Sequence, residues 1–179
     1  IHATKDNKFI CFHDFTLNRI FRKNVSVKNL NYSKIKEISS KNKRTIPLLK
    51  DLLKTSKNKY LLFIELKPAF SKKLLQKLLK ETSNYTKCVF ISFKHKNIYN
   101  LLKIKGSSKV GLSFSNTTSI KTIIKKSNNK KINCIILDKF FLKKQSIQDL
   151  KIKKYYYTIR TKLEFKKYSK NNNLIFENL

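Results

Sequence analysis

"YLLFIELKPAFSKKLLQKLLKETSNYTKCVFISF" (residues 60–93) contains a complete strand–helix–strand pattern. The runs 60–66 and 88–93 are apolar and rich in β-branched and aromatic residues, which is typical of buried strands. Between them, residues 71–82 place leucines at helical spacing behind Ser71, a residue type that caps helices. Because continuously apolar strands are buried on both faces, this pattern predicts a parallel sheet with helices outside it.

The same alternation continues to the end of the chain. Further strands are expected at 109–114, 132–137, 154–159 and 173–177, with helices at 95–104, 117–127, 144–150 and 161–170. Upstream, a strand is expected at 8–12 and a helix at 47–57, with Pro47 in its first turn. Six parallel strands fit a doubly wound sheet or a (β/α)₈ barrel. Glycine-rich phosphate loops are excluded because the only glycines are Gly106 and Gly111, which favours the barrel.

Composition indicates one globular domain over residues 1–179. The chain is 40% hydrophobic, which excludes intrinsic disorder, and no apolar run reaches the roughly 18 residues of a membrane helix. Cys11, Cys88 and Cys134 lie in apolar runs without zinc-site spacing. We therefore expect reduced core thiols, which favours a cytoplasmic compartment.

The chain carries a formal net charge of +32, from 42 Lys and Arg against 10 Asp and Glu. Such a charge predicts weak attraction to nucleic acid or anionic lipid. However, only four of the basic residues are arginines, the type that binds phosphates and bases bidentately, and the lysines are spread along the chain. We therefore expect no specific nucleic-acid partner. The alternative is a non-catalytic basic α/β module that binds RNA or anionic membrane.

Polar residues stand where several of the expected strands end. Glu65 and Lys67 are two residues apart, so strand alternation places both side chains on one face. In a barrel, the C-terminal strand ends form the active face. For Ser92, Ser113 and Asp138 we expect ordinary solvated strand ends.

Several stretches, in this order, resemble the glycerophosphodiester phosphodiesterase family. The family has a His-Asp pair followed by Thr-Leu-x-Arg, an Ile-Pro-Thr-Leu helix start, and a Glu-x-Lys strand end. The corresponding stretches are HATKDNKFICFHDFTLNRI (2–20), IPLLKDLL (46–53) and LLFIELKP (61–68). Later strand ends at VFISF (89–93), YYTIR (156–160) and NLIFENL (173–179) also look like those of the family.

The resemblance implies a TIM barrel that hydrolyses glycerophosphodiesters, small-molecule substrates, to sn-glycerol 3-phosphate and an alcohol with a divalent cation, Ca²⁺ or Mg²⁺. It implies that His13 is one of two acid–base histidines, that Glu65 is a metal ligand and that Lys67 contacts the substrate phosphate. These residue types suit the task, because an anionic phosphodiester needs a cation to neutralise developing charge and a proton for the leaving oxygen. The alternatives are a structural His13–Asp14 pair and a Glu65–Lys67 salt bridge.

Supporting roles follow for other residues. We expect Asp14 to orient His13 or form a turn, and Arg19 to tie down the loop after them. Tyr157 replaces a tryptophan of the family and is expected either to line the pocket or to pack in the core. His2 is expected to face solvent and His95 to begin a helix.

The sequence also departs from the family. The His-Arg-Gly strand with the second catalytic histidine and the Glu-x-Asp metal ligands have no counterpart, and Ile1 aligns just after that Asp. We therefore expect a TIM (β/α)₈-type barrel that is incomplete at its N-terminus, with about six of eight strands, and little or no activity from this stretch alone. A degenerate, non-catalytic scaffold of the family is the alternative. Asn7 replaces a turn glycine, and Asn tolerates positive φ. Three further replacements are Leu48 for Thr, Arg160 for Asn and Glu177 for Asp.

Overall fold

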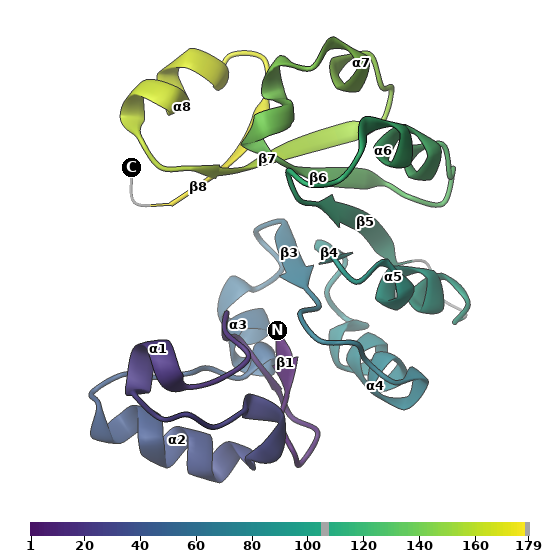
Figure 1. Ribbon diagram of the computed structural model, residues 1–179. Helices are drawn as coiled ribbons and strands as arrows, with labels where there is room; N and C mark the ends of the chain where they lie inside the picture. The colour runs from purple at the N-terminus through teal and green to yellow at the C-terminus, as the bar shows by residue number, and fades with distance from the viewer. Residues whose placement is uncertain (105–107, 178–179) are drawn as a thin grey trace.

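A curled parallel sheet of six strands in chain order forms the centre of the protein (Figure 1). The computed structural model describes residues 1–104 and 108–177; Gly106 and the last two residues of the 173–179 motif lie outside the described residues. The strands are β3 (Leu62–Glu65), β4 (Cys88–Ser92), β5 (Lys109–Phe114), β6 (Cys134–Asp138), β7 (Lys153–Ile159) and β8 (Asn173–Phe176). Every strand expected from residue 60 onward is therefore confirmed.

Helices follow the strands and cover the convex side of the sheet (Figure 1). They are α4 (Lys72–Thr82), α5 (His95–Leu102), α6 (Ile120–Ser127), α7 (Gln145–Gln148) and α8 (Lys162–Tyr168). The hydroxyl of Ser71 accepts a hydrogen bond from the amide of Leu74, at 3.2 Å, and so caps α4 as expected. A 3₁₀ helix, η2 (Lys139–Lys143), precedes α7 and is absent from the sequence-based expectations.

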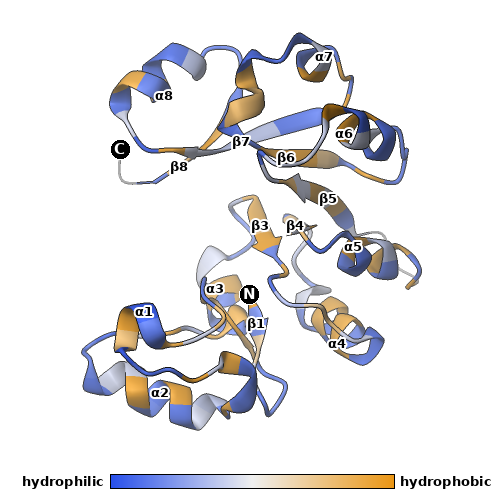
Figure 2. Ribbon diagram, viewed as in Figure 1, coloured by the Kyte–Doolittle hydropathy of each residue, from blue (hydrophilic) through white to orange (hydrophobic). Residues whose placement is uncertain are grey.

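The apolar core lies between the sheet and these helices. Strand alternation sends one set of side chains into it, including Ile64, Phe90 and Leu112, and the other set to the concave face, including Ile91 and Ile136. All five residues of β4 are buried, which confirms burial on both faces for the central strands. In Figure 2, β3 and β6 are hydrophobic, whereas the helices alternate hydrophobic and hydrophilic residues.

The region before β3 differs most from expectation. The run 8–12 contains only a short strand, β2 (Phe9–Ile10), which pairs antiparallel with β1 (His2–Ala3) and lies outside the parallel sheet. Asn7, in the turn between them, has φ of 56°, as its replacement of a glycine predicted. α3 (Leu49–Ser56) matches the helix expected at 47–57, but Leu48 is its N-cap, so Pro47 precedes the helix.

In a second apolar core, the loop after β2 packs against two helices that were not predicted from the sequence. These are α1 (Asn18–Phe21) and α2 (Tyr32–Lys41). A 3₁₀ helix, η1 (Val27–Asn29), lies between these two helices. The only buried apolar side chain on α2 is Ile35. The apolar residues of α2 are Tyr32, Ile35 and Ile38, a weak helical pattern, and packing of these side chains against residues such as Phe21 stabilises the helix.

The three cysteines are free: Cys88 and Cys134 are buried and Cys11 is half-buried, in keeping with reduced core thiols. Within residues 1–104 and 108–177, no helix combines the length and the hydrophobicity that crossing a membrane requires.

Candidate active site

A cleft of about 760 Å³ opens at the C-terminal ends of the parallel strands, on the concave side of the sheet. Segments that are distant in the sequence meet there: the loop after β2, the start of α1, the end of β3, and the ends of β7 and β8. All six site residues expected from the sequence line this cleft: His13, Asp14, Arg19, Glu65, Lys67 and Tyr157.

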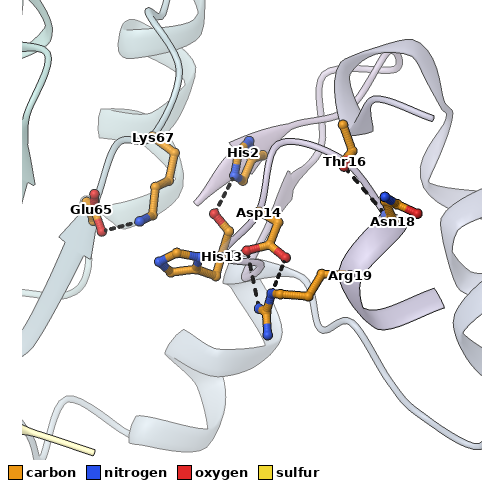
Figure 3. A network of polar contacts seen from close by, with 8 residues as sticks. All are labelled: His2, His13, Asp14, Thr16, Asn18, Arg19, Glu65 and Lys67. Atoms are coloured by element: carbon orange, nitrogen blue, oxygen red, sulfur yellow. Dashed lines mark hydrogen bonds and ion pairs between the residues drawn. The ribbon is translucent and has the colours of Figure 1, made fainter. Parts of the chain in front are cut away.

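His13 and Asp14 form a hydrogen-bonded pair at the mouth of the cleft (Figure 3). Nδ1 of His13 lies 2.8 Å from Oδ1 of Asp14, and because a carboxylate only accepts, Nδ1 is the donor. Arg19 donates two hydrogen bonds to the same carboxylate, from Nε to Oδ2 at 2.7 Å and from Nη2 to Oδ1 at 3.2 Å. These bonds, first from Arg19 and then from His13, lower the pKa of Asp14. The arrangement leaves Nε2 of His13 available for proton transfer.

Glu65 and Lys67 both point into the cleft from the end of β3, as strand alternation predicted. Nζ of Lys67 lies 3.0 Å from Oε2 of Glu65, and the side chains are only 15% and 24% exposed. Figure 3 shows this pair at the end of β3, and His13 lines the same cleft. Glu65 and Lys67 therefore form the salt bridge that was the alternative interpretation, and they also line the cleft.

Tyr157 crosses from β7 toward β5. Its hydroxyl donates to the carbonyl oxygen of Phe114 at 3.0 Å, and its ring packs edge-on against Phe93 at 5.8 Å. Burial, with smaller contributions from the charges of Asp138 and Glu65, raises the pKa of Tyr157 to about 12. Tyr157 therefore both lines the cleft and packs against its wall.

Two serines that were expected to be solvated are buried, so that prediction is wrong. Ser92 is fully buried, and its hydroxyl donates to the carbonyl oxygen of Leu66 at 2.7 Å. Ser113 is 2% exposed and lines the cleft, and its hydroxyl has no partner among the described residues. Asp138 is half-buried, and its carboxylate caps η2 by accepting from the amide of Phe140. Strand ends in a barrel meet neighbouring strands and helices, so Ser92 and Asp138 bond to backbone groups of the protein, while Ser113 is enclosed without a partner among the described residues.

The prediction that His2 faces solvent is also wrong. His2 is 3% exposed, and its Nε2 donates to the carbonyl oxygen of His13 at 3.3 Å (Figure 3). Burial lowers the pKa of His2 to about 4. His2 therefore supports the backbone of His13. His95 begins α5 as expected, and its ring lies between the carbonyl oxygen of Ser113 and Nζ of Lys126.

The apolar residues that line one wall of the cleft were not predicted from the sequence. Phe63, Phe93 and Phe176 line it. Phe63 could have been found, because it stands two residues before Glu65 and so shares its face of β3. Phe176 follows from no local pattern, since its position depends on how β8 joins the sheet.

A divalent cation needs a richer donor set than the cleft offers. Ca²⁺ and Mg²⁺ take about six or more oxygen ligands, often from several carboxylates. Within the described part of the chain, no group of three or more His, Cys, Asp or Glu side chains could hold a metal ion. Three carboxylates line the cleft, and each is paired with a basic side chain: Asp14 with Arg19, Glu65 with Lys67 and Glu177 with Arg160. The described residues by themselves therefore do not fit a divalent-cation site.

Comparison with solved structures shows the fold. A glycerophosphodiester phosphodiesterase from Thermotoga maritima is 16% identical, with a TM-score of 0.80 over 98% of this chain and 78% of that one. One from Agrobacterium tumefaciens is 13% identical, with a TM-score of 0.72 over 98% and 79%. An Oleispira antarctica phosphodiesterase in complex with the product sn-glycerol-3-phosphate is 17% identical, with a TM-score of 0.80 over 97% and 77%.

These likenesses confirm that the curled sheet is an incomplete TIM barrel of the fold that the sequence predicted. None of the curated proteins matches the chain. The model of the Glycerophosphoryl diester phosphodiesterase family matches residues 1–171, nearly the whole chain. The chain therefore belongs to the glycerophosphoryl diester phosphodiesterase family.

Proposed function

We propose that this cleft hydrolyses glycerophosphodiesters to sn-glycerol 3-phosphate and an alcohol. The observation that carries the proposal is the convergence of His13, Glu65 and Lys67 on one cleft at the C-terminal strand ends. Membership of the family supports the reaction class. The product bound in the O. antarctica phosphodiesterase supports the choice of product.

Hydrolysis forms a bond from a water oxygen to phosphorus and breaks the bond from phosphorus to the alcohol oxygen. The leaving oxygen must gain a proton and the water must lose one. A side chain that can both donate and accept a proton therefore accelerates the reaction. His13 suits this role, because Asp14 fixes the proton on Nδ1 and leaves Nε2 to exchange one with the reacting oxygen. The ammonium of Lys67 neutralises charge on the phosphate oxygens, and Glu65 holds that ammonium in place.

The divalent cation implied by the family resemblance stays a prediction, with Glu65 as one ligand. Because no three ligating side chains of the described residues are grouped to hold a metal ion, no step of the proposed reaction is routed through the cation. Its test is turnover after treatment with a chelator and after addition of Ca²⁺ or Mg²⁺.

We further propose that the chain forms one domain and that this stretch alone has little or no activity. Core residues from Ile1 to Ile159 belong to one apolar cluster, which supports a single domain. The resemblance implies two acid–base histidines, but among the described residues only His13 lines the cleft. With a single histidine at the cleft for both proton transfers, at most a very slow turnover is expected.

Turnover of glycerophosphocholine, followed by release of sn-glycerol 3-phosphate, tests the proposal. We expect a slow rate at most, and any rate that is measured should be lost in His13→Ala and Lys67→Met and retained in Lys73→Met, which removes an exposed lysine of α4. An unchanged rate in His13→Ala would contradict it, as would a native chain that neither releases sn-glycerol 3-phosphate, with or without added Ca²⁺ or Mg²⁺, nor binds it.

A further inference from the structure

A buried polar network lies directly behind the segment that carries Lys67. It consists of Ser92 at the end of β4 and Asn97 in the first turn of α5, which are 0% and 1% exposed. Nδ2 of Asn97 lies 3.3 Å from the hydroxyl oxygen of Ser92. Neither side chain is among the residues that line the cleft, so the network acts on the site through the backbone.

The network holds the carbonyl groups on both sides of Lys67. Before it in the chain, the carbonyl oxygen of Leu66 accepts from the Ser92 hydroxyl at 2.7 Å. After it, the carbonyl oxygen of Pro68 accepts from Nδ2 of Asn97 at 2.8 Å. The amide of Phe70 donates to Oδ1 of Asn97 at 2.9 Å. The backbone from residue 66 to residue 70 is thus held at three points.

Every hydrogen-bonding group of the two side chains is used. The amide nitrogen of Asn97 donates twice and its oxygen accepts once. The Ser92 hydroxyl donates once and accepts twice, from Asn97 and from the amide of Lys94 at 3.1 Å. The carbonyl and amide partners fix the orientation of the Asn97 side chain, because Pro68 offers only an acceptor and Phe70 only a donor at these contacts. A fully satisfied buried network of this kind is rigid.

We propose that Ser92 and Asn97 are positioning residues, which fix the backbone around Lys67 so that its ammonium meets Glu65 and the substrate phosphate. This inference rests on the proposed function of the cleft. Lys67 has a long, flexible side chain, and a small displacement of its backbone would move the ammonium away from both partners. Misplacement of a binding group by about 1 Å can reduce a rate about 100-fold.

Asn rather than Asp is required at position 97. An aspartate has the same shape and keeps an acceptor for the amide of Phe70, but it has no donor for the carbonyl oxygen of Pro68 or for Ser92. Asn97→Asp would place a buried carboxylate against two oxygen atoms. Ser92→Ala removes the donor to Leu66, whereas Ser92→Thr keeps the hydroxyl.

The test compares Ser92→Ala, Ser92→Thr and Asn97→Asp with the native chain. Ser39→Ala is the matched control, because Ser39 is equally buried and its hydroxyl also donates to a backbone carbonyl, on α2. Urea unfolding checks that each variant is folded. Amide hydrogen exchange at Lys67 and Phe70, affinity for sn-glycerol 3-phosphate, and kcat and KM for glycerophosphocholine are then measured.

We expect Ser92→Ala and Asn97→Asp to accelerate amide hydrogen exchange in the 66–70 segment. They should also weaken sn-glycerol 3-phosphate binding about tenfold, the effect of losing one hydrogen bond between the Lys67 ammonium and the phosphate. Ser92→Thr should restore affinity and Ser39→Ala should leave it unchanged. Faster exchange with unchanged affinity and kinetics would show a purely structural network and overturn the inference, as would unchanged exchange.

A failure of the proposed function can be told apart from a failure of this inference. If the native chain neither binds sn-glycerol 3-phosphate nor releases it from glycerophosphocholine, the proposed function fails. The ¹⁵N resonance of the Lys67 ammonium then reports on positioning, since it senses the salt bridge to Glu65. A shift in Ser92→Ala that Ser92→Thr reverses supports the inference, and an unchanged resonance overturns it.

Discussion

The Asp14 carboxylate accepts the Nδ1 proton of His13 at 2.8 Å, which makes Nε2 the nitrogen of the imidazole that can exchange protons with a substrate. Asp14→Asn replaces this acceptor with an amide and removes the preference for the productive tautomer. We expect kcat/KM for glycerophosphocholine to fall about 10- to 100-fold, as when other orienting partners of histidines are lost. His13→Ala should cost about 100- to 10,000-fold, the usual contribution of acid–base catalysis. An Asp14→Asn enzyme as fast as the native one would show that the pair is structural.

Removal of the Lys67 charge should weaken phosphate binding. In Lys67→Met, the affinity for sn-glycerol 3-phosphate is expected to fall about 10- to 100-fold, since a hydrogen bond to a charged group contributes about 1.5–3 kcal/mol. Titration calorimetry measures the change. Glu65→Gln is the complementary variant: it keeps the shape of the side chain that pairs with Lys67 but replaces its negative charge with a neutral amide. Equal affinity in the native chain and Lys67→Met would place the phosphate elsewhere.

Asp6 makes stability depend on pH. Its carboxylate accepts from the hydroxyl of Thr4 at 2.6 Å and from the amide of Tyr32 at 2.9 Å, which joins the β1–β2 turn to α2. Burial opposes ionisation, but the bonds from Thr4, Tyr32 and Lys8 together outweigh it and lower the pKa of Asp6 to about 2. Because the folded pKa lies below the ordinary value of 3.8, the stabilisation is complete above about pH 4 and is lost as the pH falls through about 2.

Asp6→Asn should therefore reduce the free energy of unfolding by about 1 kcal/mol at neutral pH, after allowance for solvent screening. Urea unfolding of both proteins between pH 2 and pH 6 should show this difference shrinking as the pH falls. Asp149→Asn, which alters a contact with Gln145 on α7, is the control. A difference that does not vary with pH would refute the linkage.

Gly111 leaves room for the side chain of Cys134 on the neighbouring strand. A Cβ at position 111 would lie 2.7 Å from Sγ of Cys134 and 3.0 Å from its carbonyl oxygen. Gly111→Ala should therefore lower the free energy of unfolding by about 1–3 kcal/mol, the usual cost of overpacking. Adding Cys134→Ala should recover part of the loss, because it removes the nearer atom. Adding Cys88→Ala, another buried cysteine, should recover none, and an equal recovery would refute the contact argument.

The net charge of +32 should give RNA binding that is weak and sensitive to salt. Release of counterions from RNA contributes less free energy to binding as the salt concentration rises. The affinity for RNA should therefore fall about 10- to 1,000-fold between 50 and 150 mM salt. Fluorescence anisotropy with a single-stranded RNA measures it. Submicromolar binding that survives physiological salt would favour the basic binding module instead.

Much of the architecture and part of the site followed from the sequence itself. The central strands β4, β5 and β6 are apolar enough to be found by composition alone, because burial on both faces leaves no polar alternation to obscure them. Glu65 and Lys67 share a face because strand alternation is a local property of the backbone. His13 stands out because a titratable pair interrupts an apolar run, and the family motifs around it are contiguous in the chain.

Other features were decided only by tertiary structure. The burial of His2, Ser92 and Ser113 depends on which distant segments pack over them. α2 is stabilised by packing more than by its own apolar pattern. The contacts of Asn97 with Pro68 and Phe70 join residues that are 29 and 27 positions apart. A sequence pattern records the local preferences of strands and helices, whereas a hydrogen bond across such a separation exists only once the chain has closed around it.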